Sequence, residues 1–254
     1  GGGNLAVANN ATVTYTGGDL DASPVYAGSI TLVSAVAVGS LEIPSSLWPA
    51  SPSSLVKTFR LNNGSPATRT TIPGPRMVNG TLDMSVGTLW NAELTCTGST
   101  VTMDTATSSF GGGSGLVLSP TVPPLTICSN GQFSLMSLEV RNDVVLAGVG
   151  GNIFVWQGLI HTSGILNLGS HTVTAANIYQ HIGGSYAATT GYLVFSGGGA
   201  NFQQGSLDFS IPNLRFASSA AANATGTGVV TVTSSLDMTF AAGPANAFTH
   251  TVSG

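Results

Sequence analysis

Three histidines follow one another at equal intervals along the chain: His161, His171 and His181. Imidazole nitrogens are common transition-metal ligands, so this spacing raises the question of a metal site. Equal spacing along extended strands does not by itself bring side chains together, however. His171 also recurs as His250 within the same His-Thr-Val phrase, and a position shared by repeated phrases is explained more simply by structure. We therefore expect no metal site and no cofactor.

Carboxylates that could serve acid–base chemistry are sparse. Asp83 and Asp237 occupy matching Leu-Asp-Met phrases, which indicates a repeated structural position and not a catalytic pair. Asp19 and Asp21 follow two glycines but fall far short of a calcium loop. β-Helix polysaccharide lyases and hydrolases need clustered charged residues at one cleft. Since only 6% of the 254 residues are charged, and these are spread along the chain, the sequence predicts a protein that is not an enzyme.

The composition bears on partners and location. A net charge of −4 with a single lysine, Lys57, argues against nucleic acid as a partner, because phosphate binding needs a basic patch. At 42% apolar residues the chain can bury a core, and a neutral surface rich in Ser, Thr and Gly suits packing against copies of itself or against cell-surface polysaccharide. Three tryptophans could also stack on sugars, although isolated tryptophans more often fill a β core: Trp48, Trp90 and Trp156.

Several residues are candidates for covalent modification. Cys96 and Cys128 could form one disulfide in an oxidising compartment, or could be two buried thiols. Asp104-Thr-Ala resembles an O-glycan acceptor pattern of some surface-exporting bacteria, with Thr105 as the acceptor. The N-glycan acceptor pattern occurs at Asn10, Asn63, Asn79 and Asn223. No signal peptide opens the chain and no apolar run approaches the length of a membrane span, so we expect a protein without a membrane span. The lysine-poor composition, rich in Ser, Thr and Gly, predicts a location outside the cell or on its surface.

Alternating apolar runs predict strands throughout, and no helix is expected. A proline-rich stretch at 44–54 marks a soft boundary between a strand-rich segment, 1–54, which could serve in capping or assembly, and a repeat region, 55–254. Within the repeat region, Leu82, Ile160 and Leu236 lie in matching phrases at nearly equal intervals. The repeat region then divides into three units: about 55–131, 132–205 and 206–254.

Such a unit is too long for one solenoid coil of roughly 20 to 30 residues, but it could be several coils. Most turns consist of small residues, and not of the tight Asn-Gly or Asp-Gly pairs flanked by strands that hairpins prefer. The many β-branched residues at alternating positions stack well along a solenoid core. We therefore predict an all-β parallel β-solenoid, or β-helix, built from about three degenerate repeats. Tandem β-sandwich or jelly-roll domains remain the alternative.

Two phrases carry a resemblance to a known class: GILNLGSHTVT at 164–174 and GYLVFSGGG at 191–199. They resemble repeats of large bacterial surface proteins, the adhesin-like, right-handed parallel β-helix proteins. The resemblance implies a secreted or surface-displayed stalk, adhesin or fibre module and no catalytic residues. Together with the composition, it predicts an extracellular structural protein, a self-assembling fibre, surface-layer or stalk subunit joined end to end by β pairing. The alternative is an adhesin or carbohydrate-binding module of a larger surface protein.

Overall fold

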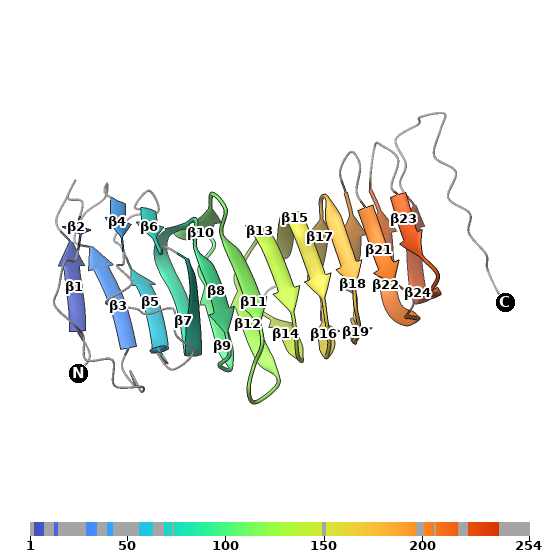
Figure 1. The fold of residues 1–254 in the computed structure, drawn as a ribbon, viewed down its shortest axis with the longest axis horizontal. Helices are drawn as coiled ribbons and strands as arrows, with labels where there is room; N and C mark the ends of the chain where they lie inside the picture. The colour runs from blue at the N-terminus through green and yellow to red at the C-terminus, as the bar shows by residue number, and fades with distance from the viewer. Residues whose placement is uncertain are drawn as a thin grey trace.

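The alternating runs form strands that pair in parallel and stack along one axis (Figure 1). The structure is a computed structural model, which describes the strands β1 (Gly3–Val7), β2 (Val13–Thr14), β3 (Ser29–Ser34), β4 (Ser40–Glu42) and β5 (Val56–Asn62). It further describes residues 69–72, 74–148, 151–196, 201–205, 207–217 and 223–238. In this described part all regular elements are β-strands, and no helix is long and apolar enough to cross a membrane.

The described strands form three rows, one on each side of every coil. The long strand β7 (Pro75–Trp90) contributes to all three rows, because its beginning, middle and end pair with three different strands. The first row continues with β8 (Glu93–Cys96), β11 (Gly115–Leu118), the second half of β13 (Phe133–Val140), the second half of β15 (Asn152–His161), β18 (Ile178–His181), β21 (Asn201–Gly205) and β23 (Asn223–Gly226).

The second row begins with β1, β3 and β5 and passes through the middle of β7. It continues with β9 (Thr100–Met103), β12 (Leu125–Ser129), β14 (Val144–Ala147), β16 (Ile165–Asn167) and β19 (Ser185–Ala187). Because β3 pairs with β5, the ladder runs across the boundary that the prolines at 44–54 suggested.

The third row begins with β2, β4, β6 (Arg69–Thr71), the end of β7 and β10 (Ser108–Gly111). The first half of β13 follows, with the rings of Phe110 and Phe133 6.0 Å apart. The row ends with the first half of β15, β17 (Thr172–Ala175), β20 (Leu193–Phe195) and the second halves of β22 (Phe209–Phe216) and β24 (Val230–Met238). The first halves of β22 and β24 follow β19 in the second row. The last two strands pair along both halves, on either side of a register shift.

The structural repeat is one coil. The register pairs Asn152 with Thr172 and Gly115 with Ser137, so a coil is much shorter than the unit that the matching phrases indicated. The prediction of an all-β parallel solenoid is thereby confirmed, and the sandwich alternative is not what forms. Coils differ in length at their corners: the corner at 119–124 is long, and its Val122 is 77% exposed.

The spacing of the matching sequence phrases is not a whole number of coils. Leu82 therefore lies in the second row, Ile160 in the first and Leu236 in the third. Matching phrases can fall on different sides of the solenoid because the strands on every side have the same alternation of inward apolar and outward polar residues.

Inward side chains of successive coils stack into columns that form one continuous apolar core. Parallel strands lie about 4.8 Å apart, so each side chain in a column contacts the one before and the one after it. A typical column of the first row has side chains no more than 2% exposed: Leu94, Leu116, Leu138, Leu159 and Tyr179. Burying one such leucine stabilises the fold by about 1.5–3 kcal/mol.

Candidate functional site

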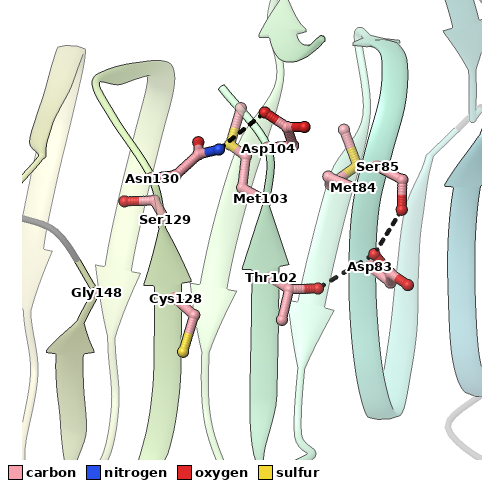
Figure 2. A pocket seen from close by; sticks show the side chains of 10 residues that line it. All are labelled: Asp83, Met84, Ser85, Thr102, Met103, Asp104, Cys128, Ser129, Asn130 and Gly148. Atoms are coloured by element: carbon pink, nitrogen blue, oxygen red, sulfur yellow. Dashed lines mark hydrogen bonds between the residues drawn. The ribbon is translucent and has the colours of Figure 1, made fainter. Parts of the chain in front are cut away.

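A groove of about 440 Å³ crosses the second row over β7, β9 and β12 (Figure 2). The register aligns Asp83, Thr102 and Cys128 in one outward column of successive coils. The lining residues are Asp83, Met84, Ser85, Thr102, Met103, Asp104, Cys128, Ser129, Asn130 and Gly148. Apolar surface makes up most of the lining, and its polar atoms come from the carboxylates, hydroxyls and amide among these residues. Met84 and Met103 are buried in the core beneath.

The carboxylate of Asp83 accepts hydrogen bonds from two hydroxyls. Ser85 Oγ donates to Asp83 Oδ1 at 2.9 Å, and Thr102 Oγ1, one coil further on, donates to the same oxygen at 3.2 Å. The carboxylate is therefore held in place from its own strand and from the next coil.

At the corner above, Asp104 and Asn130 join two consecutive turns (Figure 2). Asn130 Nδ2 donates to Asp104 Oδ1 at 2.9 Å, and the backbone N–H of Ala106 donates to the same oxygen at 3.1 Å. In return, Asn130 Oδ1 accepts from the N–H and the hydroxyl of Thr105, at 2.8 and 3.0 Å. The hydrogen bond from Asn130, followed by those from Ala106 and Thr107, holds the pKa of Asp104 below its ordinary value.

The polar side chains of this groove are suited to hydrogen bonding, in which carboxylates accept while hydroxyls and the Asn130 amide both donate and accept. A carboxylate with a lowered pKa stays ionised at neutral pH, so Asp104 is a poor general acid and a good acceptor for ligand hydroxyls. Within the described ranges, no three His, Cys, Asp or Glu side chains gather as a metal-ligand group. Sequence reasoning missed the groove because its residues are brought together by the coil register, which no short motif reveals.

The disulfide that the sequence allowed is not formed, since Cys96 and Cys128 are both free thiols. Cys96 points into the core from the first row, in register with Val78 and Leu118, and its burial raises the pKa of the thiol to about 12. Cys128 lies in the second row and lines the groove. The two side chains occupy different sides of the coil, and Cys96 fits the alternative of a small buried hydrophobe.

The possible glycan acceptors lie in different settings. Thr105 is at a turn beside the groove, with its hydroxyl donating to Asn130. Asn79 and Asn223 lie within β7 and β23. Asn10 and Asn63 are outside the described residues, as are Asp19 and Asp21.

The interval from His161 to His181 matches the length of one coil. Two of the equal intervals make up one coil, so His161 and His181 are register partners and their ring centroids are 5.4 Å apart. The expectation that equal spacing leaves these side chains apart is therefore wrong for this pair. His171 is buried at the end of the corner, directly before β17, and is not part of the pair.

The remaining candidates do not converge. Asp83 lies in the second row, whereas Asp237 lies in the third and forms an ion pair with Arg215, with Nε and Oδ2 2.7 Å apart. Trp90 is covered by the guanidinium of Arg69, 4.1 Å from the ring centroid, and by Gly111, which leaves room for the ring. Trp156 is 56% exposed and packs on Phe154, while Trp48 is outside the described residues.

Comparisons with protein-family models, with curated proteins and with solved structures give no match to this chain.

Proposed function

We propose that this chain is a non-enzymatic structural module of the cell exterior, a stalk or fibre subunit whose copies join end to end by β pairing. The shape supports a spacer role, because the coils stack along one long axis and each is hydrogen-bonded to its neighbours on three sides (Figure 1). The low charge and the abundance of Ser, Thr and Gly support a location outside the cell.

The observation that carries the proposal is the state of β24. Ile211 and Leu214 of β22 are buried, whereas their register partners Val232 and Leu236 pack on the core but stay partly exposed. Among the described residues, β24 pairs with β22 alone. A parallel strand from a second copy would extend the ladder and cover these apolar side chains, which is a head-to-tail contact that generates filaments.

Assembly can be tested by comparing two variants of β24, one with a charge at an inward position and one with a charge at an outward position. Val232→Lys places an ammonium group in the contact, whereas Thr231→Lys places it on the exposed side of the same strand. We expect filaments of the unaltered protein in negative-stain images and by sedimentation. Filaments should be lost in Val232→Lys and kept in Thr231→Lys, with the circular dichroism spectrum of a β protein in all three.

Two outcomes would contradict the proposal. The unaltered protein would remain a monomer at high concentration, or Val232→Lys would assemble as well as Thr231→Lys. Either result would leave the solenoid as a monomeric spacer without end pairing.

The groove over β7, β9 and β12 favours a second candidate, a carbohydrate-binding module. Asp83, Thr102 and Asp104 offer fixed oxygens to the hydroxyls of a neutral polysaccharide. Asp83→Ala should then weaken binding to such a polysaccharide in titration calorimetry at least tenfold, while Asp208→Ala, outside the groove, should not. Equal binding by both variants would exclude the groove as the binding site.

A further inference from the structure

The core contains one polar cluster in an otherwise apolar column. At one inward position of the first row the residues are apolar in the coils before β15: Val78, Cys96, Leu118 and Val140. The next two residues at this position are His161 of β15 and His181 of β18. A column that could have continued with valine or leucine therefore contains two ionisable side chains in adjacent coils.

Both imidazoles are removed from solvent, with 0% and 2% of their surfaces exposed. The rings meet edge to face. His161 Nε2 lies 3.2 Å from the carbonyl oxygen of Gly164, and this contact assigns the proton of neutral His161 to Nε2. His161 Nδ1 and His181 Nε2 have no hydrogen-bond partner in the described part of the chain. Each of these nitrogens could take up a proton, but the resulting N–H would have no hydrogen-bond acceptor among the described residues.

Among the described residues, the groups that face the pair carry no negative charge. Tyr186 of β19 lies against His161, with ring centroids 4.8 Å apart, and Phe209 of β22 lies against His181 at 4.2 Å. The hydroxyl of Tyr179 is 3.4 Å from His181 Nδ1 and is hydrogen-bonded to the hydroxyl of Tyr186. Burial raises the pKa of both tyrosines, so their hydroxyls stay neutral. Neither histidine has a carboxylate partner among the described residues.

We propose that the His161–His181 pair makes the section from β15 to β20 an acid-sensitive joint in the solenoid, closed while both imidazoles are neutral and opened when they are protonated. A proton on either ring would be a buried charge without a counterion, and a second proton would add repulsion between the rings. The joint is independent of end-to-end assembly, because it lies within one chain.

The pH range in which the joint loses stability follows from the lowered pKa values of the two histidines. Burial, and then the neighbouring His181, hold the pKa of His161 at about 4, and burial also lowers the pKa of His181. In the unfolded chain a histidine has a pKa near 6.5. The stability that depends on neutral imidazoles is therefore complete above about pH 6.5 and is lost progressively as the pH falls toward 4.

The test is the folding equilibrium constant, from urea unfolding, between pH 7.5 and 5. We expect this constant to fall about sevenfold between pH 6 and 5 through His161 alone, and further through His181. His161→Val and His181→Val restore the apolar column and should each flatten the dependence. Tyr186→Phe is the control: it removes the tyrosine–tyrosine hydrogen bond and should lower stability equally at every pH.

Hydrogen exchange locates the effect. Amides of β15 to β20 should become less protected at pH 5 than at pH 7, after correction for intrinsic rates, while those of β8 to β12 keep their protection. The proposal is overturned if stability is flat across this range, if both valine variants keep the full dependence, or if NMR shows His161 titrating near pH 6.5 in the folded protein.

Discussion

The carboxylate of Asp143 accepts a hydrogen bond from the backbone N–H of Ile165, one coil further along the chain, at 2.8 Å. The same relationship recurs between Asp208 and the N–H of Val229, at 2.7 Å. Each aspartate directly precedes a strand residue that is paired in the ladder. The N–H that leads into the next strand thus receives an acceptor from the coil before it, which joins the coils at a corner where the strand ladder is interrupted.

Removing this corner acceptor should lower stability. A hydrogen bond to a charged group contributes about 1.5–3 kcal/mol, and solvent at the corner reduces that figure, so we expect Asp143→Ala to lower the free energy of unfolding by about 1 kcal/mol. Asp143→Asn keeps an acceptor oxygen and should cost less. Urea unfolding at pH 7 measures both, and equal stability of Asp143→Ala and the unaltered protein would contradict the assignment.

Close packing of adjacent turns makes one glycine indispensable. A Cβ on Gly98 would lie 2.0 Å from the carbonyl oxygen of Gly80, so one of the two backbone segments would have to shift. We expect Gly98→Ala to destabilise the protein by about 2 kcal/mol or more. Gly158→Ala is the matched control, since a Cβ there meets nothing within 4 Å. If thermal unfolding shows similar losses for both variants, the close approach of Gly98 to Gly80 is not what limits the site.

The two thiols should differ in reactivity. The thiolate is the reactive form, and the burial that raises the pKa of Cys96 suppresses it, whereas Cys128 lines an open groove. Maleimide labelling followed by mass spectrometry should modify Cys128 in the folded protein, and both residues only in denaturant. Rapid labelling of Cys96 under native conditions, or a mass that reveals a disulfide, would contradict this placement.

The fold could be predicted because its signal is local. Alternating β-branched residues specify strands, and the small residues that make up most of the turns favour parallel stacking over hairpins. The coil length could not be predicted from Leu82, Ile160 and Leu236, because phrases on different sides of a solenoid look alike. Without the coil length, the interval between His161 and His181 had no structural meaning.

The groove was beyond sequence reasoning for a related reason. The step along the chain from Asp83 to Thr102 is shorter than the step from Thr102 to Cys128, because the corner at 119–124 is long. Because the number of residues per coil changes along the chain, the register of the strands cannot be deduced from sequence spacing alone. The possible disulfide was open for the same reason, since nothing in the spacing of Cys96 and Cys128 assigns them to different sides.

The corner at 119–124 lengthens one coil, yet the strands on either side of it remain paired with the coils before and after. The extra residues at this corner project into solvent, as the exposed Val122 does, and the strand pairing on either side is unchanged. Such a corner can host foreign peptide. A sequence grafted there would be displayed at a fixed position along the solenoid axis, and its length would not alter the pairing of the strands.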